Sequence, residues 1–255
     1  MDEFEAHRGL MFSIAYRMLG SVADAEDILQ EAYLRYRDVP AGSIASPRAF
    51  LSTMVTRLCL NQLQSARARR EAYIGPWLPE PVITAEQDAF SQVALEESIS
   101  MAFLVLLERL TPVERAVFLL REAFDYSYAE IAEMVGKEEA TCRQIFSRAK
   151  KFLASQRPRF SPSREQHHLI LRRFMQAVGS GNLDELIQLL AADVALWADG
   201  GGRGRGAATR VVHGPNAVAR FVLGSIRLLQ GPYEAEFTEV NREPAVILRV
   251  NGTPV

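Results

Sequence analysis

The sequence holds only two cysteines, Cys59 and Cys142, and they have neither the spacing of a disulfide framework nor that of a zinc site. Long hydrophobic runs are also missing: the longest, such as Phe103–Leu107, are far shorter than the roughly 20 residues that cross a bilayer. Charge of one sign is not in excess, with 29 basic and 31 acidic residues in 255. The acidic start, Met1 to Glu5, is unlike a signal peptide. These absences exclude disulfide-framed and membrane-spanning classes and predict a reduced, cytoplasmic setting.

The balanced total contains two segments of opposite charge. From Ala140 to Arg164 there are seven Lys or Arg residues and no acid, whereas Asp24 to Asp38 carries five acids against two Arg. A basic segment favours a nucleic-acid partner. An acidic segment is either a solvated face or a docking face, and its charge alone leaves both readings open.

Two proline-rich segments divide the sequence. The stretch Gly75-Pro-Trp-Leu-Pro-Glu-Pro81 holds three prolines in six residues, which forbids a helix interior. A second break, Arg157-Pro-Arg-Phe-Ser-Pro162, precedes a change from helical spacing to period-two alternation. The predicted order is a helical module, a linker, a second helical module resuming near Thr84, another linker and an α+β module.

The last module is expected to contain one or two helices followed by about four strands. The strands are predicted at Val194–Asp199, Thr209–His213, Glu234–Val240 and Ala245–Val250. Asn251-Gly252 is a typical hairpin turn, and its return strand would end almost at once. The domain is therefore either natively short or truncated; we expect truncation, with Ala245–Val250 at an open sheet edge.

The sharpest local pattern is a helix, a tight turn and a second helix. Ser127 and Glu130 form a capping box, and Gly136 suits the left-handed turn that ends the first helix. Cys142 and Ile145 are expected to face a core, which leaves Arg and Gln side chains outward for base edges and phosphates in a major groove. The alternative is a helical hairpin of a bundle with a solvated basic face. The acid-free basic flanks favour DNA.

Two motif blocks in order resemble extracytoplasmic-function (ECF) sigma factors of the sigma-70 family. The block Leu110–Glu122, with the helix-turn-helix and Ser147–Leu153, looks like region 4; Ala15–Gly20, Ala23–Glu31 and Pro47–Leu51 look like region 2. The resemblance covers roughly the first 155 residues and implies promoter recognition together with core RNA polymerase. The residues it implies for the minus-thirty-five element are Thr141, Arg143, Gln144, Ser147, Arg148, Lys150 and Lys151.

The same resemblance implies that the helix matching Asp24–Arg35 docks on a coiled coil of the polymerase β′ subunit, with the β subunit as a further partner. Ser21, a capping residue three positions before Asp24, is expected to start this helix, and Ile28 and Leu29 are expected to point inward. A lone charge run is usually solvated, but the family pattern favours docking. The expected core-polymerase contacts are Asp24, Glu26, Asp27, Gln30, Glu31 and Arg35.

By resemblance, the helix expected to begin at Pro47 after the cap Ser46 holds melted minus-ten DNA. Base capture needs polar groups for the base edge and apolar faces for the ring. Asn61 stands where the family commonly has Asp, so a changed base preference is expected. Cys59 repeats the apolar stripe and is expected in the core rather than as a redox sensor. The expected minus-ten contacts are Arg57, Asn61, Gln62, Gln64, Arg67, Arg69 and Arg70.

The last module resembles SnoaL-like (NTF2-type) cone domains through Phe174–Asp184, Ala192–Trp197 and an Asp-Gly-Gly-Gly motif. One ECF subgroup carries such a domain with a Trp-Leu-Pro-Glu-Pro linker and an Asp-Gly-Gly-Gly-Lys motif; here the last position is Arg203. A Trp beside prolines suits docking, although it could merely cover a nearby core edge. We expect both motifs to bring the cone domain onto region 2 and regulate it. The expected interdomain residues are Trp77, Leu78, Pro79, Glu80, Pro81, Asp199, Gly200, Gly201, Gly202 and Arg203.

Cone domains elsewhere are enzymes, which keeps an alternative open: a cyclase or isomerase tethered to a DNA-binding module, with Asp193, Asp199 and His213 as acid–base groups. A polymerase-independent repressor is a third class, but it needs no acidic docking helix. The sequence favours a sigma factor that is not an enzyme and uses no cofactor, metal or membrane; a small-molecule ligand of the cone domain stays open. The expected fold is multidomain, with all-α sigma region 2 at 1–73, a linker at 74–94, the all-α region 4 helix-turn-helix at 95–156, a linker at 157–165 and an α+β SnoaL-like cone domain, apparently truncated, at 166–255.

Overall fold

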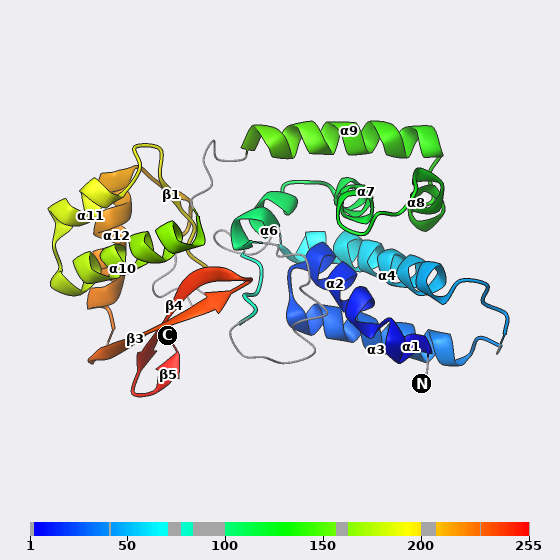
Figure 1. Ribbon diagram of the computed structural model, residues 1–255, viewed down its shortest axis with the longest axis horizontal. Coiled ribbons are helices and arrows are strands. Elements are labelled where there is room, and N and C mark those ends of the chain that lie inside the picture. The colour runs from blue at the N-terminus through cyan, green and yellow to red at the C-terminus, as the bar shows by residue number, and fades with distance from the viewer. Residues whose placement is uncertain are drawn as a thin grey trace. The chain divides into compact units, whose positions relative to one another are not determined.

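The computed structural model describes residues 3–40, 42–70, 78–83, 100–156, 163–199, 208–229 and 231–254, without the side chains of 66–70. The chain divides into two compact units (Figure 1). Unit 1 comprises Met1–Glu71 and Pro79–Pro158, and unit 2 comprises Ala72–Leu78 and Arg159–Val255. Each unit has its own hydrophobic core. In the described ranges, no helix is long and apolar enough to cross a membrane.

Unit 1 is built from helices. They are α1 (Glu3–Ala6), α2 (Arg8–Leu19), α3 (Val22–Arg37), α4 (Pro47–Arg70), α6 (Met101–Leu107), α7 (Pro112–Glu122), α8 (Tyr128–Val135) and α9 (Glu139–Gln156). The sequence correctly predicts how two of them begin: the Ser21 hydroxyl accepts the Asp24 amide at 3.2 Å before α3, and α4 starts at Pro47. The helical pattern predicted from Thr84 lies outside the described residues up to position 99, and α6 follows its cap Ser100.

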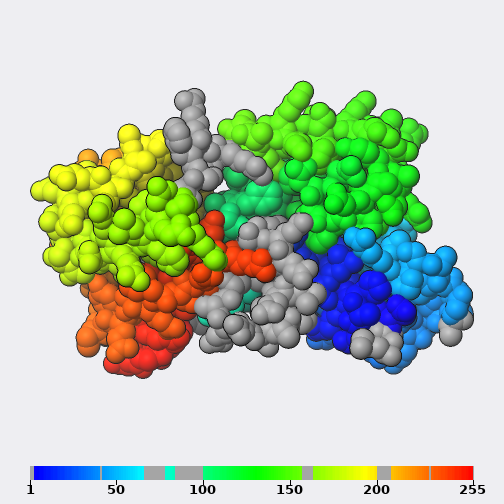
Figure 2. All heavy atoms as spheres, in the orientation of Figure 1, coloured from blue at the N-terminus to red at the C-terminus, as the bar shows by residue number. Residues whose placement is uncertain are grey.

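One core runs through the whole of unit 1. Helix α2 is buried continuously from Met11 to Leu19, because its apolar residues cover the entire circumference rather than one stripe. Helices α3, α4 and α7 all pack on it. Figure 2 shows the N-terminal helices, in blue, in direct contact with the green helices of residues 112–156. The two helical modules expected from the sequence therefore share a single core.

Unit 2 combines three helices with short antiparallel sheets. Its elements are α10 (Arg164–Ser180), α11 (Leu183–Leu189), β1 (Ala195–Leu196), β2 (Val212–His213), α12 (Pro215–Arg227), β3 (Tyr233–Val240), β4 (Glu243–Val250) and β5 (Thr253–Pro254). Strand β1 pairs with β2, and the second sheet has the order β3-β4-β5. The helices enclose a small core around Ala177, Leu186 and Ala219. Helix α10 also packs on β4.

The structure corrects the strand predictions in part. The strands expected at Val194–Asp199 and Thr209–His213 shrink to two residues each, and the sequence reading missed α12 altogether. The signal for α12 was present: Gly214-Pro215 starts it, and Val218, Val222 and Ile226 recur at helical spacing. The two later strands are confirmed as the paired hairpin β3–β4.

The turn at Asn251-Gly252 is confirmed as well. Both residues have positive φ, 51° and 76°, as a two-residue hairpin turn requires. Strand β5 returns far enough to pair Thr253 with Val250 and Pro254 with Arg249. The expectation of an open edge along Ala245–Val250 is therefore wrong at its last two residues, where β5 supplies the partner.

Candidate nucleic-acid and polymerase interfaces

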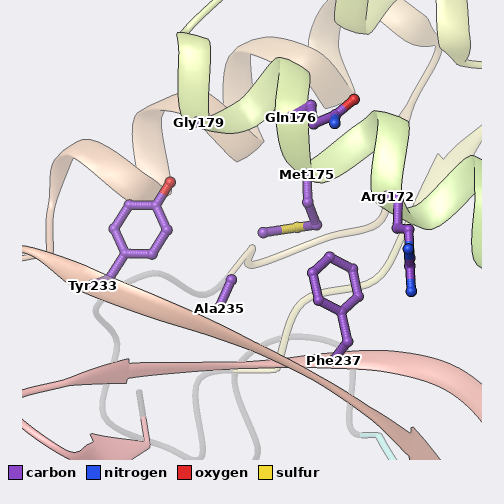
Figure 3. Close-up of a pocket in the computed structure, with 7 residues that line it drawn as sticks. All are labelled: Arg172, Met175, Gln176, Gly179, Tyr233, Ala235 and Phe237. Atoms are coloured by element: carbon purple, nitrogen blue, oxygen red, sulfur yellow. The ribbon is translucent and has the colours of Figure 1, made fainter.

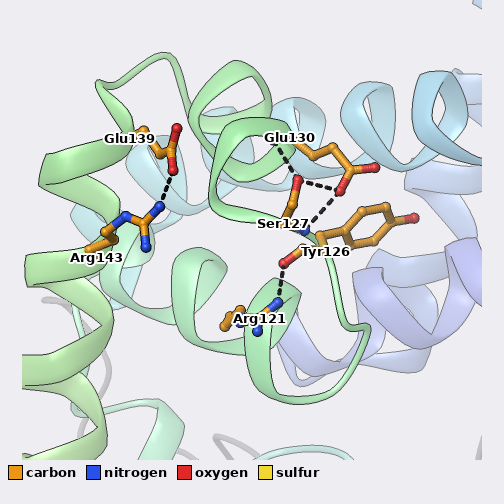
Figure 4. A network of polar contacts seen from close by, with 6 residues as sticks. All are labelled: Arg121, Tyr126, Ser127, Glu130, Glu139 and Arg143. Carbon is orange, nitrogen blue, oxygen red and sulfur yellow. Dashed lines mark hydrogen bonds and ion pairs between the residues drawn. The ribbon is translucent and has the colours of Figure 1, made fainter.

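Helices α8 and α9 form the predicted helix-turn-helix. The Ser127 hydroxyl accepts the Glu130 amide at 3.3 Å, and the Glu130 carboxylate accepts the Ser127 amide at 2.7 Å (Figure 4). Gly136 ends α8 with φ of 66°, and its amide returns to the Ala132 carbonyl. Capping and the left-handed glycine together fix the angle at which α9 leaves α8.

The inward and outward faces of α9 also follow the prediction. Cys142 and Ile145 are buried, and the residues expected to contact the minus-thirty-five element are exposed except Thr141, which is half-buried. Those exposed side chains are Arg143, Gln144, Ser147, Arg148, Lys150 and Lys151. The first four of them line a shallow hollow of about 430 Å³ on the helix surface. A basic, amide-bearing face of this kind can bind both base edges and phosphates.

Arg143 is held before any ligand arrives. Its guanidinium pairs with Glu139 one turn earlier (Figure 4). The same guanidinium lies 4.8 Å from the ring centre of Tyr128. Lys150 pairs with Glu122 on α7 at 2.9 Å. Both pairs are exposed, so each is weak and a phosphate or base edge can replace the carboxylate.

The acidic face of α3 is less uniform than the sequence predicted. Asp27, Gln30 and Glu31 are exposed, but Glu26 is half-buried and paired with Arg8 at 2.6 Å. Asp24 is half-buried as well. Glu31 pairs with Arg35 one turn on, which leaves that carboxylate accessible. The Glu26 carboxylate therefore joins α3 to Arg8 of α2 and is less accessible to a partner than Asp27 or Glu31.

Sequence reasoning missed an apolar member of this face. Leu34 is 53% exposed, unusually open for a leucine, and lies seven residues after Asp27. Positions 27, 30, 31 and 34 share one side of a helix because the turn repeats every 3.6 residues. That spacing was the signal that could have found it. The exposed leucine supplies apolar contact area beside the charges.

On α4, the predicted minus-ten residues divide into three groups. Arg57, Asn61 and Gln64 are exposed and share one face at helical spacing, whereas Gln62 is half-buried beside it. The side chains of Arg67, Arg69 and Arg70 lie outside the described residues. Cys59 is fully buried, and burial raises the pKa of its thiol. The core assignment of Cys59 is confirmed.

Arg57 already has partners in this structure. Its guanidinium donates to the carbonyl of Glu133 at 2.8 Å and to that of Met134 at 3.3 Å. Both carbonyls lie in the last turn of α8, where a helix leaves acceptors free and favours a cation. A residue predicted to bind promoter DNA thus holds the helix-turn-helix against α4.

Other contacts strengthen this junction between the two helical modules. The Tyr126 hydroxyl donates a buried 2.7 Å hydrogen bond to Ser52 on α4, and Arg48 lies 5.1 Å from the Tyr126 ring centre. Arg115 of α7 is buried and donates to the carbonyl of Met18 at the end of α2. Arg121 steadies the same loop through the Tyr126 carbonyl at 3.0 Å (Figure 4). The sequence reading predicted none of these contacts.

The described residues of the Trp-Leu-Pro-Glu-Pro segment make specific contacts. Within unit 2, the Leu78 amide donates to the Asp199 carboxylate at 3.0 Å. Within unit 1, Glu80 accepts the Val22 amide at 2.8 Å through its carboxylate and donates its own amide to Gly20 at 2.7 Å. Glu80 therefore caps the start of α3. Trp77, Gly200, Gly201, Gly202 and Arg203 lie outside the described residues.

The acid–base groups of the enzyme alternative do not form a shared site through the described contacts. Asp193 and His213 are exposed, on a turn and at the end of β2. Asp199 instead accepts a backbone amide. General acid–base chemistry needs such groups within hydrogen-bond reach of one reacting atom.

Comparison with known proteins identifies the helical modules. Residues 4–69 match the family model described as Sigma-70 region 2, and residues 100–153 match that of Sigma-70, region 4. The ECF RNA polymerase sigma factor SigJ of Mycobacterium tuberculosis is 44% identical over 230 residues, which are 89% of this chain and 73% of that protein. The probable ECF RNA polymerase sigma factor SigI of the same organism is 37% identical over 194 residues, 75% of this chain and 67% of that protein.

The fold comparison extends beyond the helical modules. A crystal structure of the M. tuberculosis extracytoplasmic function sigma factor SigJ resembles this one with a TM-score of 0.78 at 38% identity, over 99% of this chain and 88% of that one. Unit 2, with its small sheets, is included in that match. Both sigma-70 regions are matched, and the alignments with SigJ and SigI cover most of the length of each relative. The chain therefore belongs to the ECF sigma factors, the transcription initiation factors of the sigma-70 family.

Proposed function

We propose that this chain acts in the cytoplasm, where it binds core RNA polymerase and directs it to promoters through α9 at the minus-thirty-five element and α4 at the minus-ten element. The observation that carries the proposal is the exposed Arg143, Gln144, Ser147 and Arg148 face of a capped helix-turn-helix. We propose the domain boundaries that the sequence indicates, with region 2 at 1–73, region 4 at 95–156 and a SnoaL-like domain at 166–255.

Phosphate and base contacts should separate in a binding experiment. Lys150→Ala should weaken binding to all sequences alike and flatten the salt dependence, because Lys150 meets phosphates rather than base edges. Arg143→Ala should instead relax the preference at one base position. Binding to a randomised promoter library by the polymerase–sigma complex distinguishes these outcomes. A sequence-neutral effect of Arg143→Ala would contradict base recognition by α9.

For polymerase, we propose docking through Asp27, Gln30, Glu31 and Leu34 on α3. All four are exposed on one face, and they combine negative charge with apolar area. Charge reversal by Asp27→Lys or Glu31→Lys should abolish transcription in a reconstituted assay while leaving circular dichroism unchanged. Glu5→Lys, the same charge change at an exposed position of α1, is the matched control. Retained core binding by both α3 variants at moderate salt would refute docking through this face.

Promoter binding would require unit 1 to open. Glu133 and Arg143 are ten residues apart, so the chain can separate them by at most ~36 Å. Arg57 bonds directly to Glu133, which keeps its guanidinium within ~45 Å of Arg143. The names of the two promoter elements give their positions, minus thirty-five and minus ten, which are about 25 base pairs apart. At 3.4 Å per base pair this is ~85 Å along the DNA helix axis. Helices α4 and α9 therefore cannot reach both elements while Arg57 holds α8.

We also propose that unit 2 regulates this activity through the segments at 77–81 and 199–203. Support comes from the Leu78–Asp199 hydrogen bond and from Glu80, which caps the proposed docking helix two residues further on. Asp199→Asn weakens the acceptor of the Leu78 amide because it removes the charge. This variant should change transcription without changing how the chain binds minus-thirty-five DNA. Unchanged transcription would mean that the motif has no regulatory part.

A further inference from the structure

A pocket of about 620 Å³ opens between α10 and β3 in unit 2 (Figure 3). Tyr233, Ala235 and Phe237 line it from the strand, because alternate residues of a strand share one face. Arg172, Met175, Gln176 and Gly179 line it from the helix at spacings of three, four and seven residues. Its volume lies within the range of small-molecule sites, roughly 300–1,000 Å³.

The hollow exists because two small residues lie on its two walls. Ala235 separates the Tyr233 and Phe237 rings, which stand ~13 Å apart along the strand at 3.3 Å per residue. On the helix, a Cβ atom added to Gly179 would meet nothing within 4 Å. Figure 3 shows Met175 reaching from the helix toward Ala235 between the two rings. Methionine is flexible and polarisable, so it can move aside for a flat ring.

The charge around the pocket is positive. Arg172 is the charged residue among its described lining, and its guanidinium lies 5.9 Å from the Phe237 ring centre. Within the described ranges, no carboxylate pairs with Arg172. Of the three acids of β3, Glu234 and Glu236 alternate to the opposite face, where Glu236 is paired with Arg249 at 2.7 Å. Glu239 shares the pocket's face of the strand, and its carboxylate is paired with Arg164 at 2.9 Å.

We propose that this pocket binds a planar aromatic monoanion, of the size of two fused rings, whose carboxylate or sulfonate pairs with Arg172. The ring system lies between Tyr233 and Phe237 over Ala235, where both aromatic faces and Met175 contact it. The planar guanidinium offers two parallel donors to the anionic group. This site lies within unit 2, so it does not depend on promoter binding by unit 1.

The probes are two dyes with the same ring skeleton. 8-Anilinonaphthalene-1-sulfonate carries the anion, and N-phenyl-1-naphthylamine lacks it. Fluorescence titration of the full chain should show tighter binding of the sulfonate. Arg172→Gln should weaken the sulfonate roughly tenfold and the neutral dye less than about twofold, because only the charged hydrogen bonds are lost. Arg173→Gln, at the exposed neighbouring position on α10, should behave as the unaltered protein.

A filled pocket should lose both dyes. Gly179→Leu places a side chain in open space on α10 and should weaken both probes, with Ala235→Leu as a second filling variant from the strand. Equal melting temperatures by circular dichroism show that each variant remains folded. Displacement of the sulfonate dye by 1-naphthoate extends the class to carboxylates. Equal losses in Arg172→Gln and Arg173→Gln, or unchanged binding in both filled variants, would overturn the proposal.

Discussion

The hydroxyl of Tyr126 donates a 2.7 Å hydrogen bond to Ser52, and both side chains are buried where the loop before α8 meets α4. Removing one partner of a buried hydrogen bond costs about 1–3 kcal/mol, because the other is left without a partner. We expect about 1–2 kcal/mol from Tyr126→Phe and from Ser52→Ala alone. The double variant leaves no orphaned group, so the cycle should give a coupling energy of about 1 kcal/mol.

Amide hydrogen exchange of the full chain, read by mass spectrometry, measures this energy at the junction itself. Since about 1.4 kcal/mol is a tenfold change, each single variant should speed exchange of α8 amides roughly 5- to 30-fold. Tyr128→Phe is the matched control, because it removes a hydroxyl two residues further on, at the first position of α8, without touching Ser52. Strictly additive effects in the double variant would refute the reasoning, since they would mean that α8 and α4 are not joined by this bond in solution.

Three further predictions concern named side chains. Arg143→Ala or Gln144→Ala should cost about 1–3 kcal/mol of promoter affinity at the preferred sequence, measured by competition binding; losses under a few tenths would contradict base contact. Glu80→Ala should speed amide exchange in the first turn of α3 severalfold, and Glu80→Gln should restore it because its amide oxygen accepts the same bond; no rescue would count against capping. Hydrogen bonds from Ser127 hold the pKa of Glu130 below its ordinary value. Because the folded-state pKa is lowered, the capping box stabilises α8 above the ordinary pKa and loses that effect as pH falls through the lowered one. An NMR titration of that carboxyl should move upward in Ser127→Ala, and an unmoved titration would refute the cause.

The sequence predicted local structure where a chemical rule acts over a few residues. The Ser127–Glu130 box, the Gly136 turn and the Asn251-Gly252 hairpin depend on backbone groups within four positions, and all three form. Burial of Cys142 follows in the same way from helical spacing. These signals are strong because the partner of each group is fixed by the chain itself.

The missed elements fail for a different reason. Helix α12 was missed because Gly214 and Pro215 follow a glycine-rich stretch of sequence and read with it as a loop, so the helical spacing after them was left unassigned. The pairing of Glu26 with Arg8 joins residues 18 positions apart, and no local pattern encodes it. Sequence spacing placed Glu26 on the acidic face of its helix but could not show that its carboxylate pairs with Arg8.

The junction between α4 and α8 shows the same limit at the candidate site. A guanidinium suits phosphate, a base edge or the bare carbonyls of a helix end, because all three are acceptors. The sequence reading assigned Arg57 to DNA, and the structure shows it on the Glu133 and Met134 carbonyls. Those carbonyls accept from Nε and Nη2, so two of the three guanidinium nitrogens are already engaged. Under the proposed function, the distance between the two promoter elements, rather than a lack of donors on Arg57, requires α8 to separate from α4 when both elements are bound.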